Sequence, residues 1–126
     1  MLMGENRRTR VMIVDAHTMV RSGLAALLIS FDDVTLVGAA CENEAALRLC
    51  RDTRPDVVLM ALTDESVDAI SALSQLNPNA RIIALMNFED EALLARALDA
   101  GAAGYLLKNV SAARLLQAVR GDTIPA

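Results

Sequence analysis

The sequence predicts an α/β fold: a doubly wound, five-stranded parallel sheet of order 2-1-3-4-5, with helices on both faces. Short apolar segments alternate with helical segments five times along the chain, which is typical of a parallel sheet with right-handed crossovers. Of the 126 residues 54% are apolar and 22% charged, a composition that suits one domain with a full core. The order 2-1-3-4-5 is a common one for a doubly wound sheet.

Five short apolar segments are the expected strands: residues 11–15, 34–40, 57–62, 81–86 and 104–107. The third of them, VVLMAL, has no polar residue, so it is expected to be buried on both of its faces.

Five helices are expected to follow the strands, over about residues 18–30, 43–53, 67–76, 89–100 and 112–120. Thr18 and Ser111 suit the N-cap positions of the first and last helices. Pro55 follows the end of the second helix. The acids at 89–91 favour the positive end of the fourth helix, and Gly101 can end that helix in a left-handed conformation.

The charge and the cysteines exclude several classes of partner. The net charge of −4 argues against a domain that grips DNA or an acidic membrane by its overall field. Arg7, Arg8 and Arg10 are interpreted as a solvated flank. No apolar run is long enough to cross a bilayer, and the start lacks a secretory signal. Cys41 and Cys50 have no metal-ligand spacing and are expected to be unpaired, so a cytoplasmic location is expected.

The carboxyl ends of the central strands are where a site is expected in such a fold. The residues at these ends are Asp15, Ala16 and His17, then Ala61 to Thr63, Met86 and Asn87, and Lys108 and Asn109. One carboxylate beside a permanent cation is a poor Mg²⁺ site. No Ser or Cys nucleophile stands beside a base, and no glycine-rich phosphate loop follows the first strand. The sequence therefore indicates no enzyme and no metal site.

Three segments carry a family resemblance: RVMIVDAHTMVRSGLAALL, RPDVVLMALT and ALDAGAAGYLLKNVSAARLLQAV. They resemble the CheY-like receiver domain of response regulators, specifically those of the NarL/LuxR transcription regulators. The resemblance covers residues 10–121, which leaves residues 1–9 as a tail. Residues 122–126 resemble the start of a linker to a helix-turn-helix domain, which these residues do not include.

The resemblance implies a phosphorylation site whose chemistry has been lost. Such receivers hold Mg²⁺ on two adjacent acids, phosphorylate an Asp after strand three, and use a hydroxyl after strand four and a Lys after strand five. Asp15 matches the first acid, and Lys108 is retained. Ala16, Ala61 and Met86 replace the second acid, the phosphoacceptor and the hydroxyl. Neither phosphorylation nor Mg²⁺ binding is therefore expected, and the domain is expected to bind no cofactor.

The two alanines are interpreted as natural degeneration rather than an engineered knockout, because Asp64, Glu65 and Met86 also depart from the family pattern. Asp64 or Asp68 as a substitute acceptor is weighed and not favoured, since both lie beyond the strand end.

The remaining residues of the site are expected to have structural roles. Asp15 and Lys108 should form an ion pair, and Met86 should fill the space that the lost carboxylates leave. Tyr105 occupies the aromatic switch position of the family but is expected to be a half-buried aromatic residue. His17 is expected to face solvent.

A phosphorylation-independent dimerisation and interaction module of a transcription regulator is the function that this pattern favours. In the last helix Leu115, Ala118 and Val119 form the expected core stripe, and the expected interface consists of Leu116 and Ala113 with Arg114 or Arg120 on its rim. Any DNA contact would come from a C-terminal domain. The alternatives are a stand-alone protein-binding adaptor and a small-molecule sensor that uses the vacated pocket.

Overall fold

The predicted sheet is present with the predicted strand order. The computed structural model describes residues 8–121, and its five parallel strands lie in the order β2-β1-β3-β4-β5. The strands are β1 (Thr9–Val14), β2 (Val34–Ala40), β3 (Val57–Ala61), β4 (Arg81–Met86) and β5 (Gly104–Leu107).

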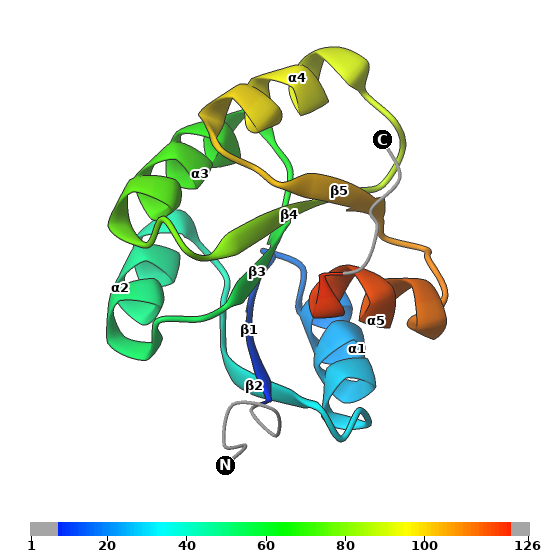
Figure 1. Ribbon diagram of the computed structural model, residues 1–126. Helices are drawn as coiled ribbons and strands as arrows, with labels where there is room; N and C mark the ends of the chain where they lie inside the picture. The colour runs from blue at the N-terminus through cyan, green and yellow to red at the C-terminus, as the bar shows by residue number, and fades with distance from the viewer. Residues whose placement is uncertain (1–7, 122–126) are drawn as a thin grey trace.

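The helices cover both faces of the sheet. They are α1 (Thr18–Ile29), α2 (Asn43–Thr53), α3 (Asp64–Leu76), α4 (Glu91–Ala100) and α5 (Ala112–Arg120). Helices α1 and α5 lie side by side on one face, and α2, α3 and α4 lie on the other (Figure 1). The right-handed crossovers of a doubly wound sheet produce this arrangement.

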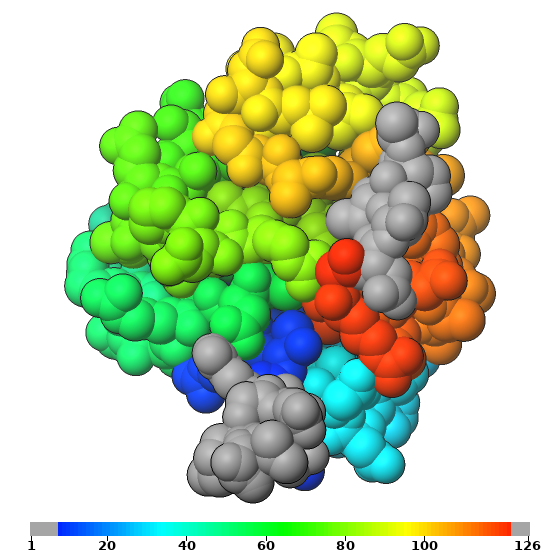
Figure 2. Space-filling model, in the orientation of Figure 1, coloured from blue at the N-terminus to red at the C-terminus, as the bar shows by residue number. Residues whose placement is uncertain are grey.

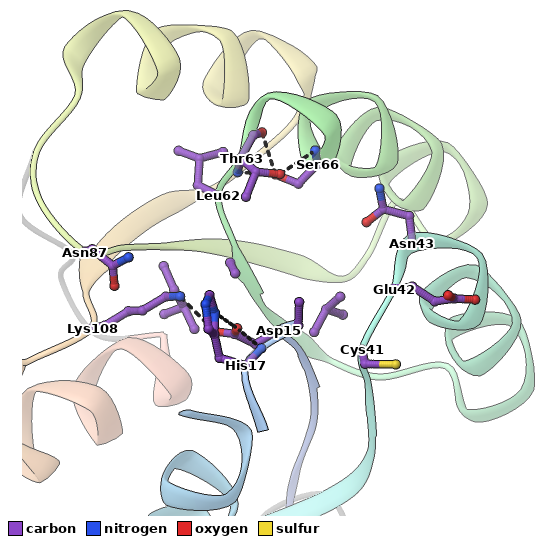
Figure 3. A pocket seen from close by; sticks show the side chains of 14 residues that line it. Asp15, His17, Cys41, Glu42, Asn43, Leu62, Thr63, Ser66, Asn87 and Lys108 are labelled. Carbon is purple, nitrogen blue, oxygen red and sulfur yellow. Dashed lines mark hydrogen bonds and ion pairs between the residues drawn. The ribbon is translucent and has the colours of Figure 1, made fainter. Parts of the chain in front are cut away.

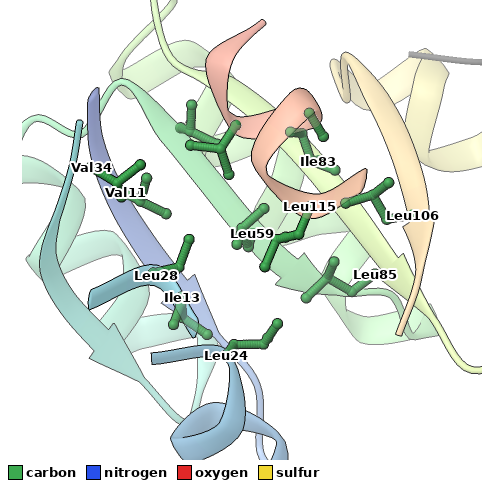
Figure 4. Packing of buried hydrophobic residues seen from close by; sticks show 13 residues of the cluster. Val11, Ile13, Leu24, Leu28, Val34, Leu59, Ile83, Leu85, Leu106 and Leu115 are labelled. Carbon is green, nitrogen blue, oxygen red and sulfur yellow. The ribbon is translucent and has the colours of Figure 1, made fainter. Parts of the chain in front are cut away.

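Each face of the sheet packs its own hydrophobic core. Leu24 and Leu28 of α1 and Leu115 of α5 pack on the strands beneath them (Figure 4). On the opposite face, α2 and α3 pack against Met12, Met60 and their neighbours. Residues of β3 alternate between the two cores, and Val57 to Met60 are all fully buried. The prediction that this strand is buried on both faces is confirmed.

Helix α3 begins three residues earlier than expected. It starts at Asp64 rather than residue 67, because Thr63 and Ser66 cap it reciprocally. The Ser66 backbone N–H donates to Thr63 Oγ1 at 3.1 Å, and the Thr63 N–H donates to Ser66 Oγ at 2.8 Å. This is the geometry of a capping box in which a Ser replaces the usual Glu or Gln.

Two other helix starts also differ from expectation. Asp90 is the N-cap of α4 and accepts the Leu93 N–H at 3.1 Å, so the helix begins at Glu91 rather than at the expected residue 89. The N-cap of α1 is His17 rather than Thr18, which is the first helical residue.

The expected N-cap of α5 is confirmed, since the Ser111 side chain accepts a backbone N–H. Helix α4 ends at Ala100, and its C-cap Gly101 has a φ of 124°, a positive value as expected.

Arg10 is a strand residue rather than part of a solvated flank. Its backbone N–H donates to Asp56 Oδ2 at 2.9 Å, and its Nη2 donates to the Thr53 carbonyl at 2.7 Å. These contacts tie the start of β1 to the segment between α2 and β3. Arg7, most of the expected tail and the expected linker lie outside the described residues. Within residues 8–121, no helix has the length and hydropathy needed to cross a bilayer.

Candidate functional site

The carboxyl ends of the strands surround a pocket of about 150 Å³. Asp15 and Lys108 line it (Figure 3). Ala16 and Ala61 line it too, and these four residues lie at or directly after the carboxyl ends of β1, β3 and β5. Main-chain hydrogen bonds of the sheet continue into these loops: the Asp15 N–H donates to the Ala40 carbonyl at 3.0 Å, and the Lys108 N–H donates to the Met86 carbonyl at 2.7 Å. The sheet therefore brings together four residues that the sequence placed at one site.

Asp15 and Lys108 form the expected ion pair at the base of this pocket. Lys108 Nζ lies 2.9 Å from Asp15 Oδ2; the Asp15 side chain is fully buried, and that of Lys108 is 13% exposed. A buried carboxylate requires such a partner because its transfer out of water is costly. The pair leaves no net charge on these two groups.

His17 and Arg21 hold the Asp15 segment in place. The His17 N–H donates to Asp15 Oδ1 at 2.9 Å, and the His17 ring lies 3.2 Å from the same oxygen. Arg21 Nη1 donates to the Asp15 carbonyl at 2.7 Å. The His17 ring is largely exposed, as expected, but its contact with Asp15 was not predicted from the sequence. An Asp whose side chain accepts the backbone N–H two residues later is a known turn pattern. The presence of Asp15 at the end of the first strand was therefore the sequence signal from which this contact could have been predicted.

The environment of Asp15 favours its charged form. Burial alone would raise the pKa of this carboxyl, but the His17 N–H and the Lys108 ammonium outweigh it and hold the pKa below its usual range. Asp15 is therefore a carboxylate throughout the neutral pH range.

The pocket wall lacks a nucleophilic oxygen at the phosphoacceptor position. Ala61 is half-exposed at the end of β3, and Ala16 is exposed after β1; both contribute only methyl groups. The nearby hydroxyls of Thr63 and Ser66 belong to the capping box of α3. Asp64 lies in the first turn of α3, where its 79% exposed side chain pairs with Arg96 at 2.8 Å.

Met86 does not fill the space that the missing carboxylates leave, so that prediction is wrong. Its neighbours Leu85 and Asn87 line the pocket, whereas the buried Met86 lines two adjoining cavities, one of which it shares with Tyr105. Successive side chains of a strand point to opposite faces, so only one of Leu85 and Met86 can face this pocket. Tyr105 is half-buried, as expected.

The residues present do not fit the Mg²⁺ ion that the family resemblance implies. Mg²⁺ takes near-octahedral oxygen ligands, which usually include one or two carboxylates. The carboxylate at the strand ends is Asp15, and it is already paired with Lys108. Glu42 also lines the pocket, but its carboxylate is directed away from Asp15 (Figure 3). Nowhere in residues 8–121 do three His, Cys, Asp or Glu side chains gather closely enough to hold a metal ion.

The interface expected on α5 is only partly available. Leu115, Ala118 and Val119 form the buried stripe, as predicted. Leu116 is half-buried and packs against the core, because it lies next to that stripe on the helix, so it is not the free contact residue that was expected. Ala113 is exposed. Arg114 is half-buried, and its buried Nη1 has no hydrogen-bond partner within residues 8–121. The other buried side-chain atom without a hydrogen-bond partner in this range is Asp15 Oδ2, whose 2.9 Å contact with Lys108 Nζ is an ion pair.

Arg120 joins the end of α5 to the loop before β2. Its Nε lies 2.6 Å from Asp33 Oδ2. In Figure 2 the red end of α5 lies against the cyan segment that follows α1. Both side chains are nearly half exposed, so the pair contributes little stability.

Comparison with protein families matches residues 11–120 to the response regulator receiver domain. Among curated proteins, the response regulator GacA of Pseudomonas viridiflava is 35% identical over 114 residues, covering 88% of this chain and 53% of GacA. The transcriptional regulatory protein LiaR of Bacillus subtilis is 39% identical, over 88% of this chain and 54% of LiaR. The chain thus spans about half the length of these curated relatives.

Solved structures show the same fold. The receiver domain of the response regulator NarL from Mycobacterium tuberculosis has a TM-score of 0.82 at 27% identity, over 91% of this chain and 98% of that one. A LuxR-family response regulator from Aurantimonas sp. SI85-9A1 has a TM-score of 0.81 at 34% identity, over 90% of this chain and 83% of that one.

Proposed function

The chain belongs to the response regulator receiver domain family, and we propose that it is a receiver that works without phosphorylation, as a dimerisation and interaction module of a NarL/LuxR-type transcription regulator. The observation that supports this most directly is the methyl group of Ala61 at the end of β3, beside an Asp15–Lys108 pair that needs no further charge. A methyl group cannot attack a phosphoryl donor.

Loss of the phosphoryl group changes how the surface of a receiver is controlled. A phosphoryl charge biases two conformations of a receiver, and without it packing alone sets their populations. Because a regulator that reads paired half-sites must be a dimer, the interface is expected to be permanent.

Sedimentation equilibrium with and without acetyl phosphate and Mg²⁺ tests this function. The proposal predicts a dimer whose dissociation constant is the same under both conditions. A receiver that has an intact phosphoacceptor Asp is the control for the activity of the reagents. A dimer that forms only with acetyl phosphate, or a chain that stays monomeric at millimolar concentration, would contradict the proposal.

The role of the whole protein is inferred from its relatives. This chain spans about half of their length, and LiaR is named as a transcriptional regulatory protein. We therefore propose that this receiver acts in the cytoplasm and that DNA binding resides in a C-terminal helix-turn-helix domain. Reading the gene past Ala126 tests this directly. An immediate stop codon would favour the stand-alone adaptor.

One observation favours a small-molecule sensor as a second candidate. The pocket beside Asp15 and Lys108 remains open, since Met86 faces away from it. A thermal-shift screen of small polar metabolites tests this candidate. A stabilising ligand whose effect disappears in Ala61→Leu would support it, and no ligand-dependent shift would leave the interaction module as the function.

A further inference from the structure

Two cavities lie beside the edge strand β5, which runs between α4 and α5 (Figure 1). The first, named the Arg114 cavity, has a volume of about 170 Å³ and is lined by Glu89, Tyr105, Leu106, Leu107, Val110 and Arg114. The second, named the Leu94 cavity, has a volume of about 270 Å³ and adjoins the start of α4. Neither cavity shares a lining residue with the pocket at Asp15, so the two belong to a separate part of the molecule.

Arg114 is a cation without a counterion at the wall of its cavity. None of the ion pairs found within residues 8–121 involves it, and its buried Nη1 has no hydrogen-bond partner in that range. A guanidinium stays charged in proteins and presents five N–H donors in a planar fork. Because a buried donor without a partner is costly, this side chain would gain from an acceptor that enters the cavity.

The rest of the Arg114 cavity is mostly aliphatic. Leu106 is buried, and Leu107 and Val110 are half-buried. Tyr105 lines both cavities, so they adjoin at this residue, and the Leu94 cavity beyond it contains the buried Met86. Apolar walls with a few fixed polar groups are typical of sites for small molecules. These walls suit a ligand with an apolar body and an anionic head.

We propose that the Arg114 cavity binds a small monocarboxylic acid, with its carboxylate on the Arg114 guanidinium and its aliphatic chain along Tyr105 toward the Leu94 cavity. The planar fork of Arg matches the two oxygens of a carboxylate. Since Nη1 is covered, the carboxylate pairs with the part of the guanidinium that lines the cavity, and rotation of the flexible side chain brings Nη1 to the second oxygen. This binding does not depend on dimerisation.

Glu89 limits the ligand to one negative charge. Its side chain is exposed, lines both cavities and takes no part in the ion pairs found within residues 8–121. A second carboxylate on the ligand would be repelled by this charge. Hexanoate should therefore bind more tightly than hexanedioate, which has a carboxylate at each end.

Tyrosine fluorescence gives a direct measurement of binding. Tyr105 is the only tyrosine of the chain, which has no tryptophan. Titration with hexanoate at constant ionic strength should change this fluorescence saturably, with a Kd on the order of 1 mM for a ligand of this size. Hexanamide has the same shape without the charge and should bind at least about tenfold more weakly.

Substitution of Arg114 tests the role of the guanidinium. Arg114→Met should raise the Kd for hexanoate at least about tenfold, as loss of a charge-assisted hydrogen bond does. It should not lower the melting temperature of the ligand-free protein, because it removes an unpartnered donor. Arg120→Met, at the other end of α5, is the matched control and should leave the Kd unchanged. Ala61→Leu should also leave it unchanged, because Ala61 lines the pocket at Asp15.

Glu89→Gln tests the limit on ligand charge. It should tighten the binding of hexanedioate more than that of hexanoate, and an equal effect on both ligands would contradict the role of Glu89.

Three results would overturn the carboxylate site. The first is a hexanoate titration that changes neither the fluorescence nor the amide shifts of residues 105–110 in a proton–nitrogen correlation spectrum. The second is equal affinity for hexanoate and hexanamide, which would show that only the aliphatic chain is recognised. The third is hexanoate binding that Ala61→Leu abolishes and Arg114→Met leaves intact, which would place the ligand in the pocket at Asp15. None of these results bears on the phosphate-independent dimer, which sedimentation tests separately.

Discussion

The Lys108 ammonium, in the connection between β5 and α5, lies 2.9 Å from the Asp15 carboxylate at the end of β1. The pair joins an inner strand to the edge strand β5 across the pocket in which the family performs its chemistry. With Ala16 and Ala61 beside it, each ion has the other as its compensating charge. The pair is thus neutral without a metal ion or a phosphoryl group.

Removal of Lys108 should therefore destabilise the domain. Lys108→Met leaves a fully buried carboxylate without its counterion and should cost about 3 kcal/mol of unfolding free energy. Asp15→Ala should cost less, because the partly exposed ammonium can turn toward water. Urea denaturation of both single variants and of the double variant measures these losses of unfolding free energy. The double variant should lose less than the sum of the two losses; additive losses would show that the two groups are not coupled.

The pair should also make stability dependent on acid. The pKa of Asp15 is lower in the folded protein than in the unfolded chain, so its contribution is complete above about pH 4 and is lost as the pH falls through the folded pKa. The wild type should be more stable than Asp15→Asn by a constant amount between about pH 5 and 8, and this difference should shrink below about pH 4. Urea melts across this range measure it. Asp33, whose pKa Arg120 also lowers, is present in both proteins and cancels in the comparison.

Carboxylates alone should restore ion binding but not switching. The pocket has room at Ala16 and Ala61, so Ala16→Asp/Ala61→Asp should bind Mg²⁺ in a calorimetric titration in which the wild type shows no binding. Acetyl phosphate should still not change the oligomeric state of this variant, because Met86 has no hydroxyl that could bind a phosphoryl group. A phosphate-dependent change of oligomeric state in this variant would show that Met86 does not block switching.

Arg81 should stabilise the end of α5 more than a surface ion pair could. Its Nη1 donates to the Ala118 carbonyl at 2.9 Å, and its Nη2 donates to the Val119 carbonyl. These are carbonyls of the last turn of α5, where a cation interacts favourably with the helix end, and the Ala118 carbonyl also accepts the Gly121 N–H at 3.2 Å. Arg81→Met should cost about 2 kcal/mol. Arg96→Ala, which removes the exposed pair with Asp64, should cost less than about 1 kcal/mol. Equal losses would show that Arg81 has no capping role.

The sequence predicted the strands well, because continuous apolar segments that alternate with helices indicate a parallel sheet. Its order was also predicted correctly, because 2-1-3-4-5 is a common order for such a sheet. The start of α3 was missed because Ser66 is not the Glu or Gln that usually marks a capping box at its third helical position. The start of α4 was missed because all three acids at 89–91 suit the positive end of a helix, and this preference does not show that Asp90 is the N-cap.

The sequence predicted which residues form the site, but not the directions in which their side chains point. Topology placed Asp15, Ala61 and Lys108 together, since all three follow central strands or the edge strand beside them. The side toward which Met86 points depends on the phase of β4 at its last residue, which the sequence does not reveal because the strand is apolar at every position from Ile82 to Met86. The burial of Leu116 likewise depends on how α5 is rotated on the sheet, and its apolar face is broad enough to include this residue.

The most direct test of the central claim is the intact mass of the wild-type chain after incubation with acetyl phosphate and Mg²⁺. Ala61 offers no oxygen nucleophile, so the mass should remain that of the unmodified chain. A hydroxylamine-labile adduct with the mass of one phosphoryl group, mapped to Asp64 or Asp68, would show that a substitute acceptor works and would contradict a receiver that acts without phosphorylation.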